Sequence, residues 1–87
     1  MTYEVELTEG AKDFLRTIPK ADAKRIGKKI ENLATNPRPH GVEKLSGEEN
    51  IYRIRSGDYL VIYQIQDKIL YILVLKVGNR KDIYKKI

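Results

Sequence analysis

The 87-residue sequence contains no cysteine and only one histidine, His40. Without cysteine the chain can form neither a disulfide nor a thiolate metal site. A single histidine is too few for the usual zinc ligand sets, and it leaves a Ser-His-Asp triad without its ordinary parts. We therefore expect no metal and no cofactor, so any catalysis has to use other residue types.

Long apolar runs are also missing. The first ten residues, MTYEVELTEG, lack the basic flank and apolar core of a signal peptide, and no apolar stretch reaches membrane-spanning length. We expect a cytoplasmic protein with no membrane partner. The length suits one small domain, which we place over residues 1–87.

Positive charge is in excess and lies mainly towards the C-terminus. Seventeen Lys and Arg stand against 12 Asp and Glu, which gives a net charge of +5. The segment KVGNRKDIYKKI carries five basic side chains and one acidic side chain. This imbalance favours a polyanionic partner but does not identify one.

The first half of the chain shows one strand pattern and two helix patterns. Residues 3–7, YEVEL, alternate with the period of a strand, and Thr8 after them is a favourable helix N-cap. Apolar residues at helical spacing follow in two stretches, residues 11–18 and 22–36, separated by Pro19. The segment NPRPHG stops the second stretch, so we expect an antiparallel helical hairpin.

The second half changes to the period of strands. Three strands are predicted at NIYRIRS (50–56), YLVIYQIQ (59–66) and ILYILVLKV (69–77), with turns at Gly57-Asp58 and Asp67-Lys68. The last strand is apolar on both faces, as expected for an interior strand. The sequence therefore predicts an α+β fold, in which an N-terminal strand and an antiparallel helical hairpin pack on a twisted antiparallel sheet.

Two arginines mark the first of these three strands. Arg53 and Arg55 are two residues apart, so they share one face of the strand. Two short helices cover only one face of a sheet, and we expect the arginine face to be the open one. Adjacent like charges repel, and a phosphodiester backbone is a plausible anionic partner. Surface ion pairs with Glu48, Glu49 or Asp58 are the alternative.

The segments EKLSG, YRIRSGDYLVIYQI and KVGNRKDIY follow a strand and two helices. This pattern resembles the RelE/ParE superfamily of bacterial and archaeal toxins, specifically its RelE-like branch, over essentially the whole chain. The resemblance implies a type II toxin, suppressed by a RelB-like antitoxin, that enters the ribosomal A site and cleaves mRNA. The alternative that it implies is a ParE-like toxin, which inhibits DNA gyrase by binding and has no nuclease chemistry.

The resemblance also implies the residues of a metal-independent endoribonuclease site. Arg53 and Arg55 match basic residues that contact the scissile phosphate. Arg80 matches a position assigned to transition-state stabilisation or leaving-group protonation, and Tyr84 matches the tyrosine proposed as general base. Nearby cations would lower the pKa of Tyr84 from its reference value of about 10.

Three lysines, Lys44, Lys81 and Lys85, are expected to bind RNA. Two positions depart from the family pattern: Leu60 replaces an arginine that helps to hold the phosphate, and Asn79 stands where relatives often carry histidine or lysine. Loss of one such charge typically costs on the order of a hundredfold in rate. We therefore expect reduced activity. A natural weak member, a detoxified variant, a non-nuclease target and a toxin-fold remnant that regulates its own operon stay open as explanations.

Overall fold

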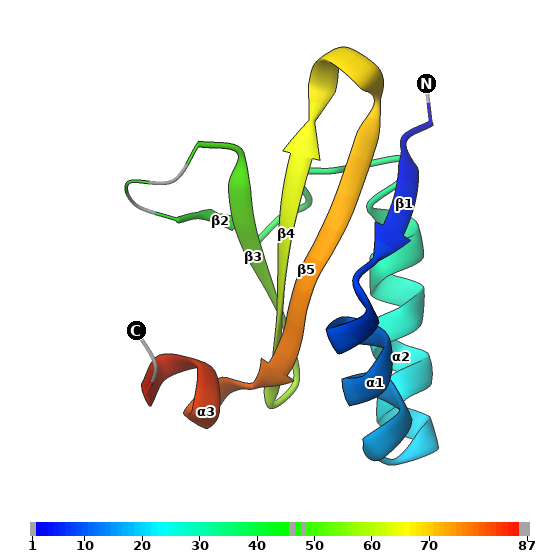
Figure 1. The fold of residues 1–87 in the computed structure, drawn as a ribbon, viewed down its shortest axis with the longest axis vertical. Helices are drawn as coiled ribbons and strands as arrows, with labels where there is room; N and C mark the ends of the chain where they lie inside the picture. The colour runs from blue at the N-terminus through cyan, green and yellow to red at the C-terminus, as the bar shows by residue number, and fades with distance from the viewer. Residues whose placement is uncertain (1, 46, 48, 86–87) are drawn as a thin grey trace.

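The computed structural model describes residues 2–45, 47 and 49–85, except for the side chains of residues 83–85 (Figure 1). Its first three elements are strand β1 (Glu4–Leu7), helix α1 (Glu9–Thr17) and helix α2 (Lys20–Asn32). They confirm the strand and the two helices predicted for the first half of the chain.

The second half consists mainly of strands. In chain order these are β2 (Glu43–Lys44), β3 (Ile51–Ser56), β4 (Tyr59–Gln66) and β5 (Tyr71–Asn79). A 3₁₀ turn, η1 (Asp67–Ile69), joins β4 to β5, and helix α3 (Arg80–Lys85) follows β5. Strands β3, β4 and β5 confirm the three predicted strands. The sequence pattern misses β2 and α3 because elements of two and six residues are too short to show a period.

The strands form one sheet in the order β1-β5-β4-β3-β2. Neighbouring strands from β2 to β5 are antiparallel, whereas β1 pairs with β5 in parallel and makes the sheet mixed. The predicted α+β arrangement is confirmed, and β5 is an interior strand, as its two apolar faces indicate.

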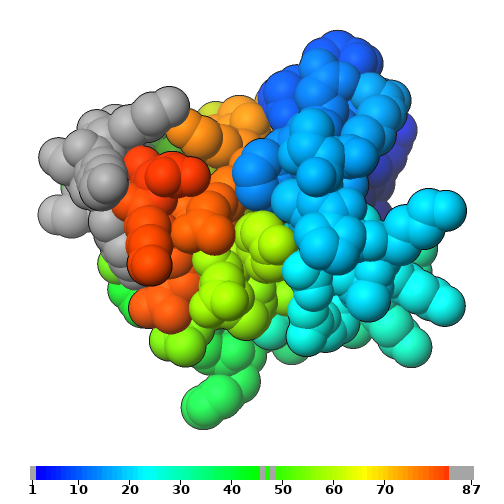
Figure 2. All heavy atoms as spheres, turned by 90° about the horizontal axis from the view of Figure 1, so that it is seen from below, coloured from blue at the N-terminus to red at the C-terminus, as the bar shows by residue number. Residues whose placement is uncertain are grey.

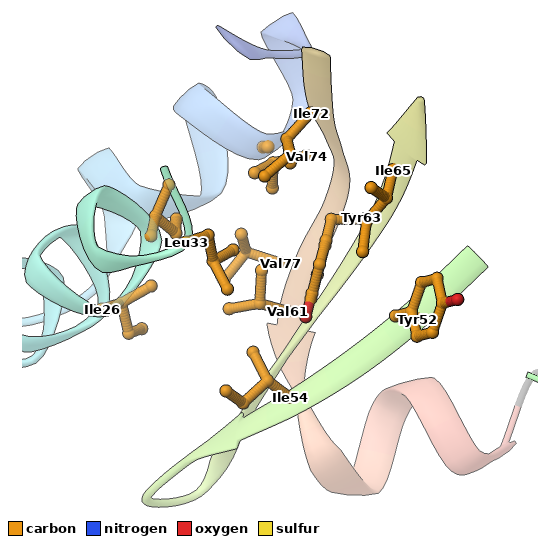
Figure 3. Close-up of a cluster of buried hydrophobic side chains, with 12 residues drawn as sticks. Ile26, Leu33, Tyr52, Ile54, Val61, Tyr63, Ile65, Ile72, Val74 and Val77 are labelled. Carbon is orange, nitrogen blue, oxygen red and sulfur yellow. The ribbon is translucent and has the colours of Figure 1, made fainter. Parts of the chain in front are cut away.

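Helices α1 and α2 lie together on one face of the sheet, and the apolar core fills the space between these helices and the sheet (Figures 1 and 3). The largest fully buried side chains are Tyr63, Ile26, Leu33, Ile65, Ile72, Val61 and Val74. They come from α2, the segment after it, β4 and β5, so the core joins both halves of the chain. No helix in the described part combines the length and apolar character needed to cross a membrane.

Thr8 connects the start of α1 to β5. Its side-chain oxygen accepts a hydrogen bond from the backbone N–H of Ala11 at 3.3 Å, as an N-cap does. The same hydroxyl donates to the carbonyl of Leu75 at 3.0 Å. The cap predicted from the sequence is therefore confirmed, and it also ties the helix to the sheet.

A glycine turn joins β3 to β4. Ser56 and Tyr59 pair across it, which leaves Gly57 and Asp58 as the two turn residues. Gly57 has a φ of +59°, in the left-handed region, and glycine at the first central position is typical of a type II′ hairpin turn. This turn sets the register that places Arg55 opposite Leu60.

A network of polar side chains lies at the end of the sheet where η1 joins β4 to β5. The Arg38 guanidinium donates to both carboxylate oxygens of Asp67, at 3.3 and 2.8 Å, and to the Tyr52 hydroxyl at 3.3 Å. The Tyr3 hydroxyl also donates to Asp67, at 2.6 Å. These bonds join the N-terminal segment, the loop after α2 and η1. Hydrogen bonds from Arg38 and Tyr3 lower the pKa of Asp67 below its ordinary value.

The charge on Asp67 should make the stability of the protein depend on pH. Because the folded-state pKa of Asp67 is lowered, its contribution is present above the ordinary aspartate pKa of about 3.9. It is lost as the pH falls through the folded-state value. We expect Asp67→Asn to be less stable than the parent at pH 7 and the difference to shrink at pH 3.

Urea unfolding at the two pH values measures this difference. Asp13→Asn is the matched control, because Asp13 forms an exposed ion pair with Arg16 on α1 and such pairs contribute little. A stability difference for Asp67→Asn that is the same at pH 7 and pH 3 would contradict the assignment.

Candidate functional site

The sheet has an open face, which we define as the face that α1 and α2 leave uncovered. Residues that pair directly across neighbouring strands point to the same face. Arg53 pairs with Glu43 on β2 and Ile62 on β4, and Arg55 pairs with Leu60. Apolar residues that alternate with these are buried in the core on the helix side. The prediction that both arginines lie on the open face is confirmed.

Arg53 forms an ion pair with Glu43. Its Nη2 atom lies 2.8 Å from Oε2 of Glu43, and the two side chains are 25% and 65% exposed. The two-residue strand β2 brings Glu43 opposite Arg53. Glu43 is thus one partner of Arg53, and it is a residue absent from the acidic set expected from the sequence, because nothing in the sequence pattern reveals β2.

Arg55 is exposed, and its backbone is held from the helix side. Its carbonyl accepts a hydrogen bond from Nζ of Lys29 at 2.7 Å, which connects α2 to the end of β3. The Arg55 guanidinium therefore stands on a fixed strand while remaining accessible to an anion.

Leu60 is buried although it belongs to the open face. Its side chain is 3% exposed, and it is absent from the core cluster under the helices. It pairs with Arg55 on one side and Gly78 on the other. Helix α3 contacts β4 and β5 on the side away from α1 and α2 (Figure 1). Position 60 is therefore packed at the end of the open face near α3.

A cavity of about 390 Å³ lies where α3 begins, lined by Asp58, Asn79, Arg80 and Lys81. Figure 2 shows the start of α3, in orange to red, beside the turn that carries Asp58, in yellow-green. The backbone N–H of Arg80 donates to the backbone carbonyl of Asp58 at 2.9 Å. In the Arg80 side chain, the Nε atom is buried and has no hydrogen-bond partner among the described residues. A buried donor of this kind favours an incoming acceptor, such as a phosphate oxygen.

Asn79 caps α3. Its side-chain oxygen accepts a hydrogen bond from the Lys81 backbone N–H at 3.1 Å, and Asn79 also pairs with Tyr59 across the sheet. Asparagine is among the best N-cap residues. The departure from the family pattern at position 79 thus has a structural role in starting the short helix.

The hydroxyl of Tyr59 anchors this end of the hairpin to α2. This hydroxyl donates to Oδ2 of Asp22 at 3.0 Å. The Tyr59 ring lies edge-on to the Phe14 ring, with 6.0 Å between the ring centroids. The hydrogen bond to Asp22 and burial raise the pKa of Tyr59. The turn beside the cavity is therefore fastened to both helices.

The other four residues predicted for the site differ in where the structure places them. Lys81 is exposed at the cavity. Tyr84 and Lys85 belong to α3, but their side chains lie outside the described part of the structure. Lys44 pairs with Tyr52, whose ring is in the core, so Lys44 lies on the opposite face from Arg53. The structure does not bring Lys44 to the open face, because its register places it one residue out of phase with Glu43.

The described residues contain no group of three metal-ligating side chains that could hold an ion. His40 is exposed in the loop after α2, as expected. The basic side chains of α2 are exposed too, which agrees with a solvated helix face: Lys24, Arg25, Lys28 and Lys29.

The sequence model of the family described as "ParE toxin of type II toxin-antitoxin system, parDE" matches residues 5–84. The chain belongs to the ParE toxin family. Curated relatives of this family member are named as RelE toxins, so it falls within the RelE/ParE superfamily and its RelE-like part. The prediction made from the segments around Arg53, Leu60 and Arg80 is confirmed.

Two curated relatives illustrate the likeness of this ParE-family chain to RelE proteins. It is 31% identical to the putative toxin RelE1 of Methanocaldococcus jannaschii over 98% of each chain. It is 29% identical to the mRNA interferase toxin RelE of Escherichia coli K12, with 93% of this chain and 86% of that one covered.

Solved structures show the same fold for this family member. The archaeal RelE–RelB complex of Pyrococcus horikoshii matches with a TM-score of 0.82 and 35% identity, covering 92% of this chain and 97% of that one. A mutant of the Escherichia coli toxin RelE in the free state matches with a TM-score of 0.79 and 27% identity, covering 98% and 93%.

Asn79 allows a direct test of how α3 is held. Asn79→Ala removes the acceptor for the Lys81 N–H, and loss of an N-cap typically costs about 1 kcal/mol. We expect the backbone amide of Lys81 to exchange with solvent roughly fivefold faster, because about 1 kcal/mol changes the opening equilibrium by that factor. Hydrogen exchange followed by NMR measures this rate.

Asn79→Asp is the matched control, because its carboxylate accepts the same bond. An unchanged exchange rate in Asn79→Ala would show that the cap does not hold α3.

Proposed function

We propose that this chain is the toxin of a type II toxin–antitoxin pair and an endoribonuclease that cleaves mRNA in the ribosomal A site, and so inhibits translation. One observation carries the proposal. Arg53 and Arg55 stand on the open face, and α3, which begins with Arg80 and contains Tyr84, lies against the same side of the sheet. The relatives named mRNA interferase support this reading.

The proposed reaction is metal-independent and uses the RNA's own 2′-hydroxyl. Its oxygen attacks the adjacent phosphorus in line, and the 2′-hydroxyl proton passes to the tyrosinate form of Tyr84. The bond from phosphorus to the 5′-oxygen then breaks, which leaves a 2′,3′-cyclic phosphate and a 5′-hydroxyl whose proton comes from Arg80 or from water. Arg53 and Arg55 neutralise the charge that develops on the phosphate oxygens. Arg80, whose buried Nε has no partner in the described part, contacts the phosphate or the leaving oxygen.

The proposed substrate arrives on the ribosome in the cytoplasm. Lys81 lies at the cavity beside Arg80, and Lys85 follows Tyr84 on α3. Lys81 extends the cationic surface beside Arg80, and we propose that Lys85 also binds the RNA backbone, whose phosphates attract such residues independently of base sequence. Lys44 has no part in this proposal, because its register turns it to the other face.

The proposed protein partner is a RelB-like antitoxin. RelE proteins of Pyrococcus horikoshii, Escherichia coli and Methanococcus jannaschii have been solved in complex with RelB. A net charge of +5 favours an acidic partner. An antitoxin that covers the open face or α3 would block access of RNA to Arg53, Arg55 and Arg80.

Leu60 is the reason to propose reduced activity. It pairs directly with Arg55 and supplies no charge. A second candidate function, inhibition of DNA gyrase by binding, is favoured by the match to the ParE family model. The two candidates differ in what an arginine at position 60 should do.

We expect Leu60→Arg to raise the rate of mRNA cleavage by on the order of a hundredfold, because the loss of one preorganised charge typically lowers the rate by that factor. The arginine stem can occupy the packed site of Leu60 while its guanidinium reaches outwards beside Arg55. Primer extension on an mRNA in a reconstituted translation system measures the cleavage, with naked mRNA as the substrate control.

Tyr84→Phe added to Leu60→Arg should abolish the cuts, because phenylalanine cannot accept the proton. If Leu60→Arg leaves translated mRNA intact, the nuclease proposal is wrong. Inhibition of gyrase supercoiling by the parent chain would then support the ParE-like alternative.

Glu43 competes with RNA for Arg53. Glu43→Gln keeps the shape of the side chain but removes its ion pair with Arg53 and one negative charge from the open face, so we expect RNA binding to tighten about two- to fivefold, within the range of an exposed ion pair. Fluorescence anisotropy with a short oligoribonucleotide measures the affinity. Glu9→Gln, which loses an exposed pair with Lys12 on α1, is the control and should have no effect. Weaker binding by Glu43→Gln would show that Glu43 orients Arg53 and does not compete.

A further inference from the structure

Strand β5 breaks its own alternation between Val74 and Val77. Side chains of a strand point to opposite faces in turn. Ile72 and Val74 are fully buried in the core, so strict alternation would place Lys76 in the core and Val77 on the open face. The opposite is observed: Val77 is 3% exposed in the core and Lys76 is exposed.

A β-bulge causes this reversal. Ile62 on β4 pairs with Lys76, whereas the next residue, Tyr63, pairs with Val74. Leu75 is therefore an extra residue with no partner on β4, which is the defining feature of a bulge. The Thr8 hydroxyl donates to its carbonyl at 3.0 Å and so satisfies a group in the disrupted ladder. Bulges redirect side chains, and this bulge turns Lys76 to the open face.

The reversal places Lys76 in the same cross-strand row as Arg53. Arg53 pairs with Ile62, and Ile62 pairs with Lys76. Strands lie about 4.8 Å apart, so the two cations flank Ile62 at roughly 10 Å between Cα atoms. In the next row Leu60 pairs with Gly78, which makes Lys76 the diagonal neighbour of position 60. Long side chains interact across such diagonals.

The ammonium of Lys76 is available to a ligand. It forms no ion pair or hydrogen bond with the described residues, whereas Arg53 on the other side of Ile62 is paired with Glu43. A lysine presents a compact charge on a flexible stem, which suits a phosphate group.

We infer that Lys76 is a phosphate-binding residue of the open face and supplies, diagonally from position 60, positive charge that Leu60 does not. The inference rests on the proposed function for its substrate, an mRNA. The phosphate that Lys76 contacts is one on or next to the scissile nucleotide, reached from the β5 side while Arg53 and Arg55 approach from β3.

The first test is binding to ribosomes programmed with an mRNA that carries a 2′-deoxy nucleotide at the cleavage position and so stays intact. Lys76→Gln should weaken binding by roughly fivefold to tenfold and reduce the slope of log affinity against log salt by about 0.7, as loss of one single-strand phosphate contact does. Lys68→Gln removes the same charge from an exposed site on η1 and should leave both unchanged. Lys76→Arg should restore binding.

The second test is a double-mutant cycle on mRNA cleavage. Lys76→Gln should slow cleavage severalfold in the parent chain and less in Leu60→Arg, because the restored arginine takes over the neighbouring charge. Equal effects in the two backgrounds would show that Lys76 acts independently of position 60.

Equal affinity and equal salt slopes for Lys76→Gln and Lys68→Gln would overturn the inference, whether or not any chain cleaves mRNA. If Lys76→Gln alone weakens binding but neither the parent nor Leu60→Arg cleaves, Lys76 stands as a phosphate-binding residue and the proposed nuclease function fails. If the parent does not bind programmed ribosomes at all, both fail.

Discussion

The pairing of β4 with β5 is the contact on which the rest of the structure depends. These two strands contribute most of the largest fully buried side chains, and those side chains lie on the face of the sheet that α1 and α2 cover (Figure 3). A slip of one residue would exchange the two faces of a strand. It would place Val61 and Tyr63 in solvent and bring Leu60 and Ile62 under the helices. The burial of the apolar face therefore also determines which side chains lie on the open face.

Different interactions dominate the two faces of the sheet, namely apolar burial on the helix side and charge interactions on the open side. On the helix side, apolar burial provides the driving force and leaves little tolerance for changes in volume. On the open side, charged groups gather that contribute little to stability and repel one another unless an anion or a carboxylate is present. Glu43 fills that role for Arg53 in the free chain. Under the proposed function, such a surface persists in the free chain and gains free energy when a phosphate binds.

Periodicity was sufficient to predict the main strands, the helical hairpin and the face that carries Arg53 and Arg55. It failed where structure depends on pairing between distant segments. Strand β2 has two residues and exists only through β3, so neither the ion pair of Glu43 nor the orientation of Lys44 could be read from the sequence. The orientation of Lys76 could not be read from the sequence for a different reason: a bulge leaves no mark in the hydrophobic pattern, since Leu75 simply continues the apolar run that begins at Ile69. The segments around Arg53 and Arg80 identified the family because short motifs are informative even where a helix such as α3 is too short to predict.

The parallel pairing of β1 with β5 has a consequence for the order of folding. Residues 4–7 pair with residues 71–74, so the first strand to be synthesised has to wait for the last. Contacts this distant in sequence carry a large loop-closure cost and slow the search for the native state. A nascent chain that ends before residue 71 lacks both the partner of β1 and the segment that carries Arg80. The catalytic constellation proposed for this chain is therefore assembled late, after nearly all of the other residues have been made.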